Sequence, residues 1–396
     1  MTSTDSLPRR RLNGLDGLRF VAAAAVVGYH YTGVGTTYWG AVPSHVFPSL
    51  NHLTRYGYLG VELFFVVSGF VILMTAYGRP IEKFTASRIA RLFPAYWAAV
   101  VLTVGLHLLW RGGIRTSSLE SLVNLTMVQG GFNIQDVQGA FWTLWIELKF
   151  YLLIGVFILL GITRRRVIAF AVLWPLLGVL AGSQPGLLSA LLVPIYAPYF
   201  GVGMLLFLMY RDGHSTLVWL GIGFTGILSV RAAMNGAGAA SKLVGASVSP
   251  AVAGVLVLGM IAAVYLVTAG PGARIGWRWL TTLGLLTYPL YLVHGQFGFF
   301  VIDMLNGRLN DYAVLALAVG VSVALAVGLH YGIERVFHDR LRDAVVNGLR
   351  DSEPSAPGTA PSVSARPASE PPAVPAQTSQ PVDDDRTDPV LEPAAR

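Results

Sequence analysis

The sequence predicts an all-α fold, a polytopic transmembrane helical bundle. Hydrophobic residues make up 54% of the 396 residues and charged residues only 12%, which is about half the charged fraction of an ordinary soluble domain. Apolar stretches of roughly twenty residues, each long enough to cross the hydrocarbon core of a bilayer, recur along most of the chain. The membrane is therefore expected to be the scaffold of the whole fold.

About ten transmembrane helices are predicted from these stretches. An even number of crossings returns the chain to the side on which it starts. Arginines precede the first stretch, as in a secretory signal, but no small-residue cleavage site follows it, so we expect a retained first helix. The predicted spans are residues 15–33, 58–77, 92–110, 141–161, 167–182, 187–209, 215–231, 250–269, 280–301 and 312–333.

Lys and Arg residues are unequally divided between the two sides that ten crossings define. With a cytoplasmic N-terminus, sixteen of them fall on the cytoplasmic side and six on the opposite side, an asymmetry typical of membrane proteins. We therefore expect a multipass protein of the cell (plasma or inner) membrane, with both termini in the cytoplasm. The formal net charge of +7 is then a topology signal, and no nucleic-acid partner is expected.

The C-terminal part of the chain differs in composition from the rest. Residues 351–396 hold ten of the 22 prolines and cannot bury enough apolar surface to fold. Within the apolar part, the loop 111–140 carries a stretch too short to span, Leu119–Val128, which we expect to be interfacial or re-entrant. The predicted parts are a basic cytoplasmic N-terminus (1–13), a transmembrane domain (14–342) and a disordered cytoplasmic tail (343–396).

The chain contains no cysteine, which excludes disulfides, thiolate metal sites and a cysteine nucleophile. Several enzyme signatures are also missing, among them the P-loop, the H-E-x-x-H motif and the G-x-S-x-G elbow. We expect no metal ion and no permanently bound cofactor. Any covalent chemistry must use other side chains.

The first predicted span carries two ionisable residues on one face. Arg19 and His30 are eleven residues apart, and in an α-helix this spacing returns to within about 20° of the same direction after a rise of about 16 Å. An arginine in a membrane segment is costly unless it is paired or faces a wet cavity, so Arg19 is a candidate functional residue. An ion pair with Asp16 and a packing role for His30 are the alternatives.

Other polar residues lie within or beside the later spans. Arg88 and Arg91 are three residues apart, so they share one face if the segment is helical and could hold a phosphate, although positive-inside charge explains them equally well. Glu147 lies inside the fourth span and needs an arginine, a histidine or a substrate hydroxyl as its partner. Ser68 and His294 could simply pack helices together. Histidine, carboxylate and arginines within a bilayer favour base-assisted transfer to a hydroxyl.

These residues lie in motifs that resemble the integral-membrane acyltransferase-3 family. The likeness covers residues 13 to about 340 and rests on six matches in the same order. It implies that His30 is the catalytic histidine and that Arg19, Arg88 and Arg91 act in catalysis or hold the donor. The matching segments are Leu15–Arg19 with His30, Val61–Phe70, Arg88–Pro94, Phe141–Glu147, Tyr288–His294 and Glu334-Arg335.

The resemblance implies a membrane-embedded O-acyltransferase with acyl-CoA, usually acetyl-CoA, as its co-substrate. The acceptor is expected to be a hydroxyl of a carbohydrate, a glycolipid or a glycosylated metabolite such as a macrolide. His30 would act as general base, with Glu147 or His294 orienting it or completing a proton relay. Arg19 would hold a phosphate of coenzyme A, and Ser68 is expected at the same donor site.

Two questions remain open from the sequence. Direct transfer and a transient acyl-histidine are both compatible with the residues. A multipass transporter or flippase for a lipid-linked sugar or a small metabolite is the alternative function, since intramembrane ionisable residues also form proton relays. The oligomeric state is not predicted.

Overall fold

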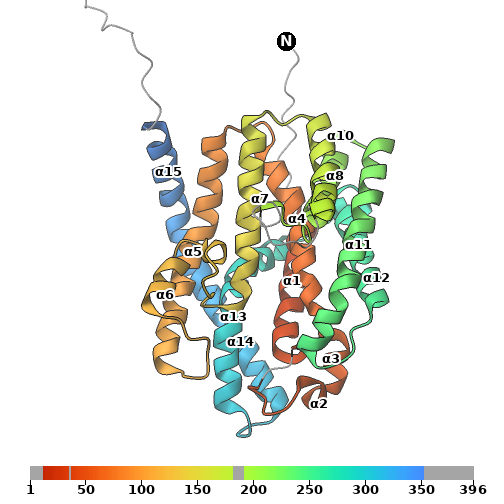
Figure 1. Ribbon diagram of the computed structural model, residues 1–396. Helices are drawn as coiled ribbons and strands as arrows, with labels where there is room; N and C mark the ends of the chain where they lie inside the picture. The colour runs from red at the N-terminus through yellow and green to blue at the C-terminus, as the bar shows by residue number, and fades with distance from the viewer. Residues whose placement is uncertain (1–11, 35–36, 182–190, 352–396) are drawn as a thin grey trace, which may run out of the picture. The chain divides into compact units, whose positions relative to one another are not determined.

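The computed structural model describes residues 12–34, 37–181 and 191–351, and every regular element in these residues is helical (Figure 1). The helical bundle predicted from the sequence is therefore confirmed. The longer helices are α1 (Asn13–Gly28), α4 (Gly60–Ala76), α5 (Ile81–Leu109), α7 (Trp142–Leu159), α8 (Arg164–Ala181), α10 (Ala197–Asp212), α11 (Thr216–Val244), α12 (Pro250–Thr268), α13 (Arg278–Leu305), α14 (Asp311–Leu329) and α15 (Arg335–Asp351). The shorter elements are α2 (Pro43–Val46), α3 (Pro48–Thr54), α6 (Ser118–Asn124), the π-helical segments η1 (Tyr29–Gly33) and η6 (His330–Glu334), and the 3₁₀ turns η2 (Gly57–Leu59), η3 (Gln129–Gly131), η4 (Gly139–Phe141) and η5 (Pro271–Arg274).

Seven helical stretches in the described residues are long and apolar enough to cross a membrane. They contain α4, α5, α7, α11, α12, α13 and α14. Helices α1, α8 and α10 overlap the other three predicted spans but are not among the seven, so the count of ten stays a prediction. Part of the predicted span 187–209 lies outside the described residues.

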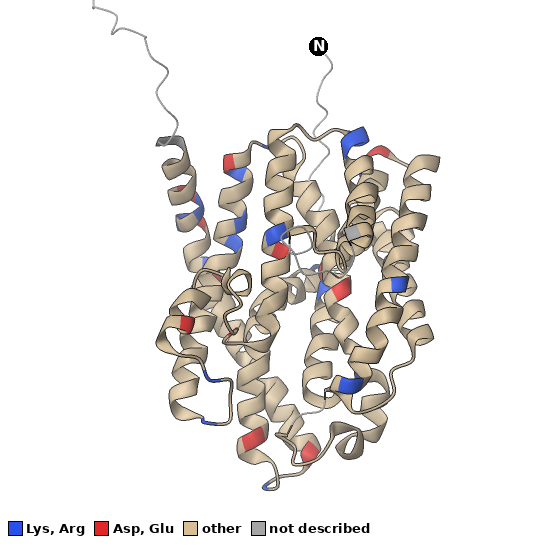
Figure 2. Ribbon diagram, viewed as in Figure 1, with Lys and Arg blue, Asp and Glu red and all other residues tan. Residues whose placement is uncertain are grey.

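Loops that were predicted to share a side of the membrane lie at the same end of the bundle. At the end with α2 and α3, here called the outer end, Arg55 Nη1 donates to the Ser247 carbonyl at 2.8 Å. At the end where α1 begins, here called the inner end, Arg164 lies 4.0 Å from Asp212. Charged residues also lie between the helix ends (Figure 2). These two contacts agree with the predicted sides of the four loops involved, while the number of crossings and the cytoplasmic location of the inner end stay predictions.

Helices α4 and α10 approach each other closely at two glycines. A Cβ atom on Gly69 would lie 2.2 Å from the Phe200 carbonyl oxygen, and one on Gly203 would lie 2.0 Å from the Val66 oxygen. No larger residue fits these positions without moving a backbone, which is the close contact that small residues allow between membrane helices. Gly69 belongs to the segment Val61–Phe70, so this motif contains a glycine that lets α4 pack closely against α10.

Helix α11 is longer than the predicted span 215–231, which is a correction to the sequence analysis. The helix continues to Val244 and ends at Gly245, which adopts φ +69°, as is common at helix C-termini. The predicted span ends too early because the residues after Arg231 are mostly small and contribute little hydropathy. Arg231, expected in an outer loop, is therefore an exposed residue inside α11.

The loop before α7 returns to the middle of α5. The Tyr96 hydroxyl donates to the Asn124 carbonyl at 2.6 Å, and the Trp97 indole donates to the Leu125 carbonyl at 2.9 Å. Helix α6 begins with a capping box, in which Ser117 and Glu120 satisfy each other's backbone N–H groups. This geometry fits the expected interfacial or re-entrant placement of Leu119–Val128.

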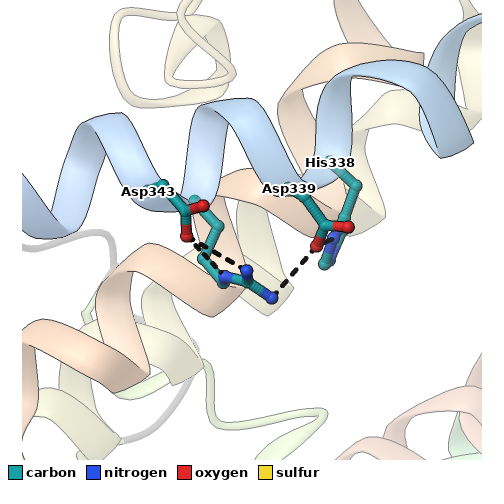
Figure 3. A network of polar contacts seen from close by, with 4 residues as sticks. His338, Asp339 and Asp343 are labelled. Carbon is teal, nitrogen blue, oxygen red and sulfur yellow. Dashed lines mark hydrogen bonds and ion pairs between the residues drawn. The ribbon is translucent and has the colours of Figure 1, made fainter.

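The helical structure continues beyond the predicted end of the transmembrane domain. Helix α15 follows η6, packs against α5 and runs to Asp351, so residues 343–351 are helical rather than part of the predicted tail. Figure 3 shows the polar network on its exposed side, where Asp339 and Asp343 each lie 3.0 Å from Arg342. Exposed pairs of this kind add little stability, and they keep this side of the helix polar. Residues 352–396 lie outside the described residues.

Candidate functional site

His30 and His294 form a hydrogen-bonded pair inside the bundle. His30 lies in η1, where the Val34 N–H donates to the Tyr29 carbonyl five residues earlier at 2.7 Å. Such π-helical turns occur often at functional sites. His294 is fully buried in α13, and its Nε2 lies 3.2 Å from Nδ1 of His30. The two residues come from distant parts of the sequence, so the fold creates the pair.

The neighbouring carbonyl groups determine which nitrogen of each neutral ring carries the proton. His294 Nδ1 lies 2.8 Å from the Tyr291 carbonyl and therefore donates to it, which leaves Nε2 as an acceptor. His30 Nδ1 lies 2.8 Å from the Val26 carbonyl and donates both to it and to His294 Nε2. The remaining nitrogen, His30 Nε2, then has a free lone pair, which a general base needs.

A first pocket, here called the inner pocket, collects the predicted donor-site residues. Arg19, Ser68 and Glu147 line it, together with Tyr288 and Tyr291, and it holds ≈ 540 Å³ of empty space including its open side. Glu147 Oε1 accepts hydrogen bonds from Ser68 Oγ at 3.2 Å and from the Tyr151 hydroxyl at 2.6 Å. Helices α1, α4 and α7 thus bring a guanidinium, a hydroxyl and a carboxylate into one cavity.

Two further arginines lie close to this pocket. Arg88 Cζ is 5.9 Å from the centre of the Tyr151 ring, and Arg91 is within electrostatic range of Arg19. Both are carried by α5, which begins at Ile81 and so includes the basic segment that the sequence placed before a span. Their helical spacing, assumed in the sequence analysis, is observed. Arg88, Arg91 and Arg19 therefore direct positive charge toward Glu147 and Tyr151.

A second pocket, here called the outer pocket, contains His30. Its polar residues besides His30 include Glu62 in the first turn of α4 and several tyrosines, and α11 forms an opposite wall of small residues. It holds ≈ 1280 Å³ of empty space including its open side. Val61 and Tyr291 line both pockets. The two cavities therefore meet at these side chains, close to the histidine pair.

The structure brings some of the predicted site residues together and separates others. His30 and His294 are in contact, and Arg19, Ser68 and Glu147 share the inner pocket. Glu147 lines a different pocket from His30, so of the two expected orienting residues it is His294 that touches the histidine. The alternative prediction for Arg19 was an ion pair with Asp16. It is compatible with the structure, since Asp16 is within electrostatic range of Arg19.

Sequence reasoning missed several polar residues in the two pockets or beside them. Tyr151 is four residues after Glu147, a helical spacing that would have indicated a contact. Tyr196 and Tyr199 line the outer pocket from the segment before and inside α10, and no spacing in the sequence connects them with His30. Glu62 was part of a quoted motif but received no role.

The chain as a whole is similar to known proteins. Residues 12–331 match the model of a protein family described as an acyltransferase domain. The chain is 26% identical over 318 residues to "Putative membrane-bound transacylase BcsY" of Komagataeibacter xylinus, with 73% of this chain and 74% of the relative covered. It is 30% identical over 173 residues to "Putative peptidoglycan O-acetyltransferase YrhL" of Bacillus subtilis (strain 168), with 38% of this chain and 24% of that protein covered. No solved structure matches the chain.

Proposed function

This chain belongs to the acyltransferase-3 family, and we propose that, as a membrane O-acyltransferase, it moves an acyl group from acyl-CoA to a hydroxyl of a carbohydrate. The acyl group is acetyl, and the carbohydrate is part of a glycan, a glycolipid or a glycosylated metabolite such as a macrolide. One observation carries the proposal: His30, with a lone pair free on Nε2, lines the aromatic outer pocket, which shares Val61 and Tyr291 with the arginine-lined inner pocket. The enzyme works in the cell membrane with its inner end toward the cytoplasm.

The inner pocket suits the acyl donor. Coenzyme A carries several phosphate groups, and arginine is the side chain best matched to phosphate because its donors form a planar fork. Arg19 lines the pocket, and Arg88 and Arg91 lie beside it. In the proposal these residues hold the nucleotide end, and Ser68 contacts the donor from α4. The eleven residue steps from Arg19 to His30 span about 16 Å in a helix, which is similar to the reach of the pantetheine arm.

His30 Nε2 is the general base in the proposed reaction. It takes the proton of the acceptor hydroxyl while the oxygen attacks the thioester carbonyl carbon, so a C–O bond forms and the C–S bond breaks. The imidazolium then gives its proton to the departing thiolate of coenzyme A. His294 Nε2 accepts from His30 Nδ1 and stabilises the positive charge on the ring during the step. His294 is a positioning residue in this scheme. A transient acyl-histidine remains a variant of the same proposal.

The outer pocket suits a carbohydrate acceptor. Its tyrosine and tryptophan rings offer flat apolar surfaces, with hydroxyl and carboxyl groups at their edges. One relative is named for O-acetylation of peptidoglycan, a polymer with a glycan backbone, which supports the same class of acceptor. In this orientation the donor reaches His30 from the cytoplasm and the acceptor reaches it from the outer end.

Turnover of a labelled donor tests the proposal. Purified protein in lipid nanodiscs receives [¹⁴C]acetyl-CoA and an extract of the host's glycolipids and metabolites, and wild type is compared with His30→Ala. We expect label to move to an acceptor and coenzyme A to be released, with the rate falling by a factor of about 10² to 10⁴ in the variant.

A matched control separates loss of the base from a general effect. His214→Ala changes an exposed histidine in the loop between α10 and α11 and should leave the transfer rate unchanged. Wild type that releases no coenzyme A from acetyl-, propionyl- or longer acyl-CoA would contradict the proposed donor.

A further inference from the structure

Two buried polar groups of the outer pocket have no hydrogen-bond partner. They are Glu62 Oε2 and the Tyr58 hydroxyl, and neither is bonded to any other group in the described residues. Leaving a buried polar group unpaired costs free energy, and each such group in a folded protein requires an explanation. A bound molecule that pairs with both groups would supply one.

Both groups belong to the cavity that His30 faces. Glu62 and Tyr58 line the outer pocket together with His30. The Tyr29 ring lies next to both His30 and Tyr58, since its centre is 5.4 Å from the centre of the His30 ring and 5.8 Å from that of the Tyr58 ring. Glu62 is also within electrostatic range of Tyr29 and Tyr58. A ligand that places one group at His30 can therefore reach Glu62 and Tyr58 with another.

The opposite wall leaves space for a ring. On α11, residues with small side chains face the cavity, and Trp142 and Tyr196 lie at another side. A flat, partly apolar ring can pack between such surfaces while its substituents reach the polar groups at the edge. The small residues that line the wall are Ala232, Ala233, Gly236, Ala239 and Ala240.

The unpaired groups indicate how many hydroxyls the acceptor carries. A simple alcohol has one hydroxyl, which His30 uses, so Glu62 and Tyr58 would stay unpaired in its complex. A site built to bond a substrate hydroxyl rejects an analogue without it by as much as about 10⁴ to 10⁵. A second hydroxyl can donate to the Glu62 carboxyl and accept from the Tyr58 hydroxyl at the same time.

We propose that Glu62 and Tyr58 bind a second hydroxyl of the acceptor, so that the outer pocket selects a polyhydroxylated ring over a simple alcohol. This inference rests on the proposed function, because it assumes that the acceptor occupies the pocket of His30. It assigns Glu62 a role in specificity rather than in the chemical step. The reacting hydroxyl and the recognised hydroxyl then belong to the same acceptor molecule.

A binding experiment tests this inference without any acyl transfer. Protein in lipid nanodiscs is titrated with phenyl β-D-glucopyranoside and with 2-phenylethanol, and saturation-transfer difference NMR gives a Kd for each. We expect wild type to bind the glucoside at least tenfold more tightly than the alcohol. Glu62→Ala should remove this preference, Tyr58→Phe should reduce it, and Glu62→Gln, which keeps an oxygen acceptor, should retain part of it.

Two controls distinguish recognition from an effect on folding. Glu82→Gln makes the same chemical change at the inner end of α5 and should leave both Kd values unchanged. Glu62→Ala should also keep or raise the thermal unfolding temperature, because it removes an unpaired buried group. A structural role for Glu62 would lower that temperature instead and overturn the inference.

The remaining outcomes separate this inference from the proposed function. Equal affinity of wild type for the two probes, no binding of the glucoside, or an unchanged preference in Glu62→Ala would each overturn it. A glucoside preference that depends on Glu62, in a protein that transfers no acyl group, would support the pocket assignment and contradict the acyltransferase proposal alone.

Discussion

Nε2 of His294 lies 3.2 Å from Nδ1 of His30, and the backbone carbonyl of Tyr291 holds the other nitrogen of His294 at 2.8 Å. This chain of contacts leads from a buried backbone oxygen to the open nitrogen of His30. It fixes the orientation of the His30 ring and leaves Nε2 without a proton.

Replacing His294 should slow the reaction without weakening donor binding. His294→Ala removes one of the two acceptors of His30 Nδ1–H and leaves the Val26 carbonyl as the other, so we expect kcat to fall by about 10- to 100-fold while the KM for acetyl-CoA stays within a factor of two. His294→Gln offers an oxygen acceptor and should recover part of the rate. Steady-state kinetics with the same acceptor check both values. A rise in the donor KM with unchanged kcat would contradict the positioning role.

Replacing Arg19 should weaken binding of a donor that carries phosphate groups. Arg19→Ala should raise the KM for acetyl-CoA by about tenfold or more, because a charge-assisted bond is lost. The same variant should use S-acetylpantetheine, which has no phosphate, as well as wild type does. An equal loss with both donors would assign Arg19 to the chemical step instead.

Replacing Glu147 should destabilise the bundle around the inner pocket. Glu147→Ala leaves Ser68 and Tyr151 without their acceptor and removes the negative charge near Arg19, so we expect a loss of about 1–3 kcal/mol in unfolding free energy. Thermal unfolding in detergent measures the change. The double variant with Arg19→Ala should lose less than the sum of the two single changes. Strict additivity would show that the two residues are not coupled.

Adding a methyl group at Gly69 should disturb the contact between α4 and α10. The new Cβ would lie 2.2 Å from the Phe200 carbonyl oxygen, so we expect Gly69→Ala to cost about 1–3 kcal/mol. Gly259→Ala in α12 is the matched control, since no atom lies within 4 Å of the added Cβ. Its unfolding temperature should stay the same or rise. A Gly69→Ala protein as stable as the control would contradict the packing argument.

Helix positions could be predicted well from the sequence, because a hydrocarbon core selects long apolar stretches whatever their contacts. The end of α11 could not, since the residues after Arg231 are small and contribute little hydropathy. The extension of α5 back to Ile81 was missed for a related reason. Its first turns are basic, so they do not resemble a span although they continue the same helix.

The members of the site could be identified from motifs, but their arrangement could not. Most of the helices lie between His30 and His294 in the sequence. The packing of α1 against α13 is what brings the two rings together. The π-helical turn at His30 also has no signal in the residue pattern. Glu147 was expected to orient His30 because a carboxylate inside a membrane span needs a partner, yet its hydrogen bonds are to Ser68 and Tyr151.

The junction of the two pockets has a consequence for the energy supply of the cell. A membrane protein with an opening at each end would dissipate the proton gradient if the openings joined into a continuous aqueous path. Val61 and Tyr291 line both cavities, and the Tyr291 hydroxyl is held by the Thr143 hydroxyl at 2.7 Å and the Ala140 carbonyl at 3.1 Å. In the proposed reaction, these side chains must let an acyl group meet its acceptor while they stop the flow of ions. In that scheme the residues between the two pockets also insulate the membrane.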